Sequence, residues 1–100
     1  MGETAPRQRA IITIASKPVM PPYIKMRHDA GRNRWIILAP ERLFDPDEIA
    51  VGILKLCDGQ RTVGDIAAVM AKEYNAPAEE IEADIIAMFQ DLADKGVVKA

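Results

Sequence analysis

The stretch Leu56-Cys57-Asp58-Gly59-Gln60-Arg61-Thr62 separates two kinds of sequence pattern. It closes a first helix; the residues before that helix show strand patterns, and the residues after the stretch show helical spacing. Gly59 predicts the left-handed residue that follows a helix C-terminus. Thr62 predicts the cap of the next helix, and Asp65 completes a capping-box pattern. The stretch is therefore expected to form a tight hinge between two helices.

Three short strands are predicted ahead of the first helix. The segment Tyr23–His28 alternates in polarity, which predicts a half-buried strand with His28 as a partly buried residue. Residues 29–33 form a hairpin loop by composition. Trp35–Ala39 is apolar throughout, so it is expected to be the central strand and to be covered on both faces. Arg42–Phe44 is a short third strand at one edge, which completes an antiparallel meander.

Three amphipathic helices are predicted to follow. Asp45 is expected to cap the first, with Pro46 in its first turn, and the last should close at Lys95-Gly96. The Val97-Val98 tail is expected to pack back on the core. The predicted apolar faces comprise, in order, Ile49, Ile53, Leu56 and Cys57; Val63, Ile66, Ala67, Met70 and Tyr74; and Ile81, Ile85, Met88, Phe89 and Leu92.

These elements predict an α+β fold that resembles a winged helix-turn-helix, with a three-stranded antiparallel sheet followed by three helices. The chain of 100 residues suggests one domain. Prolines and basic residues interrupt its beginning. We therefore expect a disordered linker at residues 1–17 and a single globular domain at residues 18–100.

Charge is divided unevenly along the chain. Residues 1–44 hold eight Lys/Arg and three Asp/Glu, a net charge of +5, whereas residues 45–100 hold five and twelve, a net charge of −7. Solubility and an electrostatic role in partner binding both explain this division. The sequence shows no signal peptide and no apolar run of the roughly 20 residues that a membrane span needs. A cytoplasmic protein without a membrane partner is expected.

No residue pattern indicates catalysis or a bound cofactor. A lone cysteine on an apolar helix face, as Cys57 is, indicates a small buried hydrophobe. A nucleophile would need a base, and a metal site would need more ligands than Cys57 and His28 supply. No glycine-rich phosphate loop is present. The domain is therefore expected to have no enzymatic activity, no cofactor and no metal.

Two kinds of binding module are compatible with this layout. A winged-helix regulator would insert a helix into DNA, but the last helix is acidic before Lys95 and would be repelled by phosphates. We therefore expect no nucleic-acid partner. The other kind is a protein-interaction module, because an edge strand can accept an extended peptide as an additional strand. The cleft between Arg42–Phe44 and the last helix would then supply side-chain contacts.

Three groups of residues resemble one family in particular. These are Leu38-Ala39-Pro40-Glu41, the hinge Leu56–Thr62, and Asp84 followed by the closing Gly96. Their order and spacing over residues 18–98 are similar to protein D of pyrroloquinoline quinone (PQQ) biosynthesis. The chain departs from the family pattern at Asp45-Pro46-Asp47, where many members carry an asparagine near the helix start.

The resemblance implies a peptide chaperone in PQQ biosynthesis that performs no chemistry itself. Such a protein is expected to bind the ribosomal precursor peptide, protein A, and to present it to a radical S-adenosylmethionine enzyme, protein E. In some members the domain is fused behind the oxidase protein C, so residues 1–17 are compatible with an inter-domain linker. A monomer is the expected oligomeric state.

The resemblance also implies a peptide site between the third strand and the last helix. In related recognition domains the leader peptide adds beside the third strand. The residues implied for this site are Glu41, Arg42, Leu43, Phe44, Ile81, Asp84, Ile85 and Met88.

Overall fold

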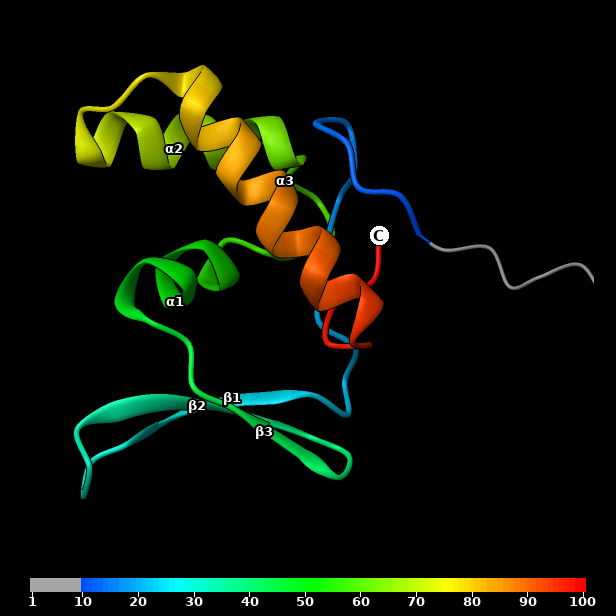
Figure 1. Ribbon diagram of the computed structural model, residues 1–100, viewed down its shortest axis with the longest axis vertical. Helices are drawn as coiled ribbons and strands as arrows, with labels where there is room; N and C mark the ends of the chain where they lie inside the picture. The colour runs from blue at the N-terminus through cyan, green and yellow to red at the C-terminus, as the bar shows by residue number, and fades with distance from the viewer. Residues whose placement is uncertain (1–9) are drawn as a thin grey trace, which may run out of the picture.

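The computed structural model describes residues 10–100 and shows a sheet followed by three helices (Figure 1). The strands are β1 (Lys25–Asp29), β2 (Arg34–Ala39) and β3 (Arg42–Phe44). The helices are α1 (Glu48–Lys55), α2 (Val63–Tyr74) and α3 (Ala78–Asp94). The predicted α+β class is confirmed, and the winged-helix description is compatible with this arrangement.

The strands form an antiparallel meander in the order β1-β2-β3, with β2 in the centre as predicted. The carboxylate of Asp29 accepts hydrogen bonds from the N–H groups of Gly31 (3.1 Å) and Arg32 (3.4 Å), which turns the first hairpin. Glu41 takes a positive φ of 59° in the second turn. The resulting register places Ile37 between its partners on β1 and β3.

Within residues 10–100 the sheet is covered on one face only, so the prediction that β2 is covered on both faces is wrong. All three helices lie on the same side of the sheet (Figure 1). Ile37 points toward them and is buried, whereas the other residues of β2 are half-buried. His28 is exposed, contrary to the prediction, because it lies near the turn of the β1–β2 hairpin, where its ring packs 5.3 Å from that of Trp35.

Helix α1 begins later than predicted. Asp47, and not Asp45, caps it, with a carboxylate oxygen 2.8 Å from the backbone nitrogen of Ala50. Phe44 still belongs to β3, so the chain uses the next two residues to leave the sheet. The predicted face shifts as a result: Ile49 is 52% exposed, and the buried residues of α1 are Val51, Ile53 and Leu54.

The hinge between α1 and α2 is closed by an aspartate side chain. Asp58 accepts hydrogen bonds from the N–H groups of Gln60 (2.9 Å) and Arg61 (2.8 Å). Gly59 has a φ of 77° as expected, but α1 ends at Lys55, so this glycine belongs to the loop and does not directly follow the helix. The predicted capping box is confirmed: Thr62 and Asp65 exchange two hydrogen bonds of 3.0 Å.

The core lies between the sheet and helices α2 and α3. Every predicted apolar residue of α2 is buried except Tyr74, which is 46% exposed because the helix ends there, beyond the core. Lys95 and Gly96 close α3 as expected, with Gly96 at a φ of 79°. The tail is buried as predicted. The main core cluster comprises Ile12, Ile24, Ile37, Ile53, Leu54, Cys57, Val63, Ile66, Ala67, Met70, Ile85, Phe89, Val97 and Val98.

Residues 10–19 form a segment that we call the N-terminal strap. Ile12 is buried, and the side chain of Gln90 on α3 binds the strap backbone at Ala10 (2.8 Å) and Ile12 (3.0 Å). The first two N–H groups of α2 donate to strap carbonyls at 2.8 and 2.9 Å, so the strap satisfies donors that a helix start leaves free. The part of the predicted linker that the structure describes therefore packs on the helices. Residues 1–9 lie outside the described residues, and the boundary at residue 17 stays a prediction.

The hinge aspartate should make stability depend on pH. Hydrogen bonds from the backbone N–H groups of Arg61 and Gln60 lower the pKa of Asp58. A lowered pKa stabilises the fold above the ordinary carboxyl value of about 3.9, and this contribution is lost as the pH falls through the folded value. Asp58→Asn should therefore lower the Tm at pH 7, and the difference from wild type should shrink below about pH 4.

Thermal unfolding followed by circular dichroism between pH 7 and pH 3 measures this effect. Glu73→Gln is the matched control, because the Glu73 side chain makes no hydrogen bond or ion pair within residues 10–100. A Tm difference for Asp58→Asn that stays constant across this pH range would contradict the assignment.

Candidate functional site

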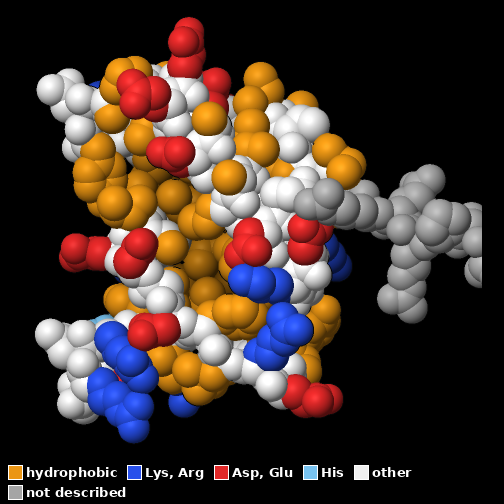
Figure 2. Space-filling view, viewed as in Figure 1, with side chains coloured by type: hydrophobic (Ala, Val, Ile, Leu, Met, Phe, Trp, Pro, Cys, Tyr) orange, Lys and Arg blue, Asp and Glu red, His pale blue; other side chains and the backbone are white. Residues whose placement is uncertain are grey.

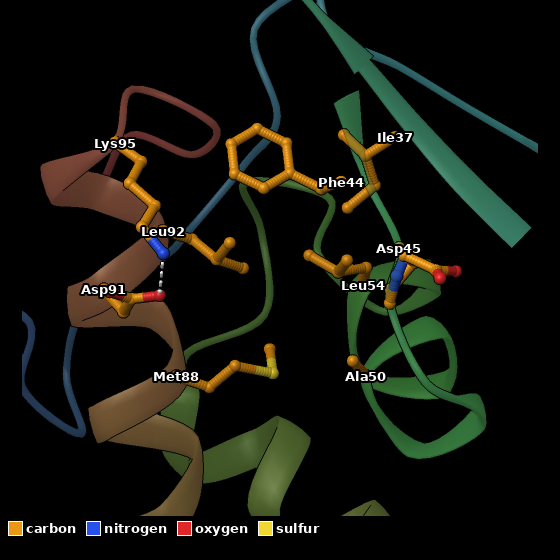
Figure 3. Close-up of a pocket in the computed structure, with 10 residues that line it drawn as sticks. Ile37, Phe44, Asp45, Ala50, Leu54, Met88, Asp91, Leu92 and Lys95 are labelled. Carbon is orange, nitrogen blue, oxygen red and sulfur yellow. Dashed lines mark hydrogen bonds and ion pairs between the residues drawn. The ribbon is translucent and has the colours of Figure 1, made fainter. Parts of the chain in front are cut away.

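An apolar depression opens between β3, α1 and α3, with a volume of about 170 Å³ (Figure 3). Tertiary packing brings these segments together although they are up to about 58 residues apart, from Ile37 to Lys95. The lining residues are Ile37, Phe44, Asp45, Pro46, Ala50, Leu54, Met88, Asp91, Leu92 and Lys95. We call this depression the β3–α3 pocket.

The pocket has an apolar floor and a charged rim. Ile37 and Leu54 are buried beneath it, and the half-buried side chains of Phe44 and Met88 reach into it from β3 and α3 (Figure 3). A surface of this kind favours an apolar group that would otherwise be exposed to water.

The rim on the α3 side carries an ion pair. The Lys95 ammonium lies 2.9 Å from the Asp91 carboxylate and 5.9 Å from the centre of the Phe44 ring. This cation therefore spans from the end of α3 toward β3, across one side of the pocket.

The structure brings only some of the implied site residues together. Phe44 and Met88 line the pocket. Leu43 is 59% exposed, and its partner across the sheet is Leu38, so its side chain lies on the face away from the helices. Glu41 and Arg42 are exposed at the sheet edge.

The implied residues in the first half of α3 lie outside the pocket lining. Ile85 is 1% exposed and belongs to the core, whereas Ile81 is half-buried and packs against the core, and Asp84 is exposed. Sequence reasoning missed Leu54 on α1 and Leu92 and Lys95 at the end of α3. Helical spacing offered one signal for them, because Leu92 follows Met88 by one turn.

A second, more polar depression of about 370 Å³ lies at the far end of the sheet, against the start of α1. Its lining residues are His28, Asn33, Arg34, Trp35, Pro46, Asp47 and Glu48. Lys55 places its ammonium 4.6 Å from the Trp35 ring nearby. Most of these side chains are exposed and polar, so this depression offers little apolar surface to a ligand.

Neither the cysteine nor the histidine is placed for chemistry. Cys57 is buried in the core, as predicted, and desolvation followed by the nearby Asp58 charge raises the pKa of its thiol to about 12. His28 contacts Trp35 at the end of the hairpin. Within residues 10–100 no three His, Cys, Asp or Glu side chains are grouped so as to hold a metal ion. In the same range no helix has both the length and the apolarity to cross a membrane.

A family model described as coenzyme PQQ synthesis protein D (PqqD) matches residues 34–98. A PqqA binding protein of Bradyrhizobium diazoefficiens is 54% identical over 85 residues, which cover 85% of this chain and 82% of that protein. The bifunctional coenzyme PQQ synthesis protein C/D of Methylorubrum extorquens is 45% identical over 82 residues, which cover 82% of this chain and 22% of that protein. Separate and fused proteins are thus both similar to this chain.

Two solved structures share the fold. The solution NMR structure of the PqqD truncation of Methylobacterium extorquens PqqCD matches with a TM-score of 0.78 and 42% identity, over 89% of this chain and 95% of that one. That truncation represents a functional, stand-alone recognition element for ribosomally synthesised and post-translationally modified peptides. The crystal structure of PqqD from Xanthomonas campestris matches with a TM-score of 0.57 and 34% identity, over 89% of this chain and 99% of that one.

Burial of the thiol predicts low reactivity. With a pKa of about 12, Cys57 carries very little thiolate at pH 8, whereas an unfolded cysteine has a pKa near 8.5. A thiol reagent at pH 8 should therefore react roughly a thousandfold more slowly with the native protein than with the protein in denaturant. The Cys57→Ala variant has no thiol and measures the background reaction of the reagent. Equal rates in the two states would show that the thiol is accessible and would reopen a chemical role for it.

Proposed function

This chain belongs to the family of coenzyme PQQ synthesis protein D, and we propose that it binds the precursor peptide PqqA and presents it to protein E. The observation that carries the proposal is the similarity to proteins named PqqA binding protein over more than four fifths of both chains. The similar M. extorquens domain is a peptide recognition element that functions on its own. In the proposed role the chain is a carrier, and the radical S-adenosylmethionine enzyme performs the chemistry.

Addition of the peptide as a strand beside β3 is the mechanism that the site favours. The sheet has two edges, because its strand order is β1-β2-β3. An edge strand keeps backbone N–H and C=O groups that a peptide can pair with. The apolar β3–α3 pocket adjoins β3, whereas the depression near the β1–β2 hairpin is polar. A peptide on β3 therefore gains apolar contacts in addition to backbone hydrogen bonds.

The pocket suits one large apolar side chain of the peptide. An apolar cavity of about 150 Å³ can hold a benzene molecule, and the β3–α3 pocket has a volume of about 170 Å³. The backbone would fix the peptide's direction, and the side chain seated in the pocket would fix its register. Phe44 and Met88 are the side chains that we assign to this anchor, together with Leu54 and Leu92.

The other residues implied for the site take different parts in this proposal. Glu41, Arg42 and Leu43 would contribute mainly through the backbone and edge of β3, because the Leu43 side chain faces away from the pocket. Ile85 would act only through the core that supports α3, since its side chain is buried. Ile81 and Asp84 would contact only a peptide that extends along α3 beyond the pocket.

Truncating a side chain that lines the β3–α3 pocket should weaken peptide binding. Met88→Ala should raise the Kd for a synthetic PqqA peptide by about tenfold, because the truncation removes apolar contact in the pocket and a tenfold loss corresponds to about 1.4 kcal/mol of binding free energy. Isothermal titration calorimetry measures the affinity. Val69→Ala on α2 is the matched control, because Val69 is an exposed apolar residue that does not line the pocket.

Three outcomes of this titration are informative. A tenfold loss in Met88→Ala with no change in Val69→Ala supports the anchor. Equal affinities in both variants would contradict the pocket assignment while leaving peptide binding intact. The absence of saturable heat with the wild-type protein at micromolar concentrations would contradict the proposed function.

A further inference from the structure

The sheet exposes a second surface, on the side opposite the helices. Strand residues alternate between faces, and Ile37 points toward the helices. Its neighbours Ile36 and Leu38 therefore lie on the opposite face. The register places Arg27 beside Ile36, and Lys25 and Leu43 beside Leu38. We call Lys25, Arg27, Ile36, Leu38 and Leu43 the outer sheet face.

This face combines an apolar centre with unpaired positive charge. Ile36 and Leu38 are half-buried and Leu43 is exposed, which gives a continuous apolar row across two strands. The Lys25 and Arg27 side chains are exposed, and within residues 10–100 neither has a carboxylate partner. In the part of the chain that the structure describes, all three helices lie on the other side of the sheet (Figure 1).

The positive charge of the outer sheet face indicates which kind of partner can bind there. Two cations that have no carboxylate partner among residues 10–100, placed beside an apolar row, complement an apolar protein patch that is bordered by Asp or Glu. The distribution of charge on the surface supports the same conclusion. In Figure 2, Lys and Arg side chains gather around the sheet, whereas Asp and Glu side chains are numerous over the helices. The sheet and the helices would therefore attract different partners.

The outer sheet face is also continuous with the proposed peptide edge. A strand added to β3 extends the sheet, and every second side chain of that strand would lie on the same face as Leu43. A protein seated on this face would touch the carrier and the bound peptide at once. A partner on the helical side would not meet this composite surface.

We propose that the outer sheet face is the docking surface for the enzyme that modifies the peptide, which binds through an acidic, apolar-centred patch. This inference rests on the proposed function, because the enzyme is the one to which the peptide is presented. It adds the face that the enzyme uses and the charge that its patch must carry. Lys25 and Arg27 would provide orientation, and the apolar row would provide buried area.

A double charge reversal tests the proposal. The purified radical S-adenosylmethionine enzyme of the same organism is titrated, at low salt, with the protein already loaded with PqqA peptide. Lys25→Glu with Arg27→Glu should raise the Kd for the enzyme by about tenfold. The affinity for the PqqA peptide alone should stay unchanged, since neither residue lines the β3–α3 pocket. The affinity of the wild-type complex should also fall with added salt.

The matched control reverses two exposed lysines elsewhere, in Lys17→Glu with Lys72→Glu, which changes the net charge equally. Unchanged enzyme affinity in this control, with the loss confined to the sheet variant, supports the proposal. Equal affinities in the two variants would overturn it while leaving the proposed function intact. A wild-type protein that binds the peptide but not the enzyme would contradict both the docking surface and presentation.

A second copy of this chain is the alternative occupant, since its helices are acidic. Sedimentation velocity of the protein alone distinguishes it. A monomer at the titration concentrations is the expected result. A dimer that dissociates in the Lys25→Glu, Arg27→Glu variant would assign the outer sheet face to self-association and overturn docking of the enzyme.

Discussion

The structure depends on a three-way backbone junction at Val19. The N–H and C=O groups of Val19 pair with Lys99 in two hydrogen bonds of 2.8 and 2.9 Å, and the neighbouring Pro18 carbonyl accepts from Gly59 at 3.0 Å. The strap, the hinge and the C-terminal tail are thus held together. Gly59 has a φ of 77°, a backbone conformation that residues with a Cβ rarely adopt, so the junction favours glycine at this position of the hinge.

This junction fixes the relative positions of the elements that form the β3–α3 pocket. It ties the exit of α1 to the end of α3, while α2 and α3 pack against each other above the sheet (Figure 1). Helix α1 and the end of α3 are then left on opposite sides of the β3–α3 pocket, with Leu54 and Met88 facing it. The sheet closes the pocket from below through Ile37. The hinge therefore positions the β3–α3 pocket without lining it.

Local patterns predicted most of the fold because local interactions create it. The capping box at Thr62, the turn at Gly96 and the stripe of α3 each depend on residues within a turn or two. The error about the covering of β2 arose because contacts between residues far apart in the sequence decide which faces of a sheet are covered. Nothing in the sequence near Ile36 indicates whether a helix covers its face of the sheet. The cap of α1 is a local error, because Asp45 directly follows the last residue of β3 and Asp47 caps the helix instead. The pocket was half predicted: Phe44 and Met88 follow from the resemblance, but Leu54 and Lys95 meet them only through tertiary packing.

We propose that the peptide lies as an added strand on β3, beside the β3–α3 pocket. Intermolecular nuclear Overhauser effects between isotope-labelled protein and unlabelled PqqA peptide measure this most directly. We expect backbone-to-backbone contacts between the peptide and residues 42–44, together with side-chain contacts from one apolar peptide residue to Met88. Backbone contacts along β1, or contacts to the helices without any to β3, would contradict it.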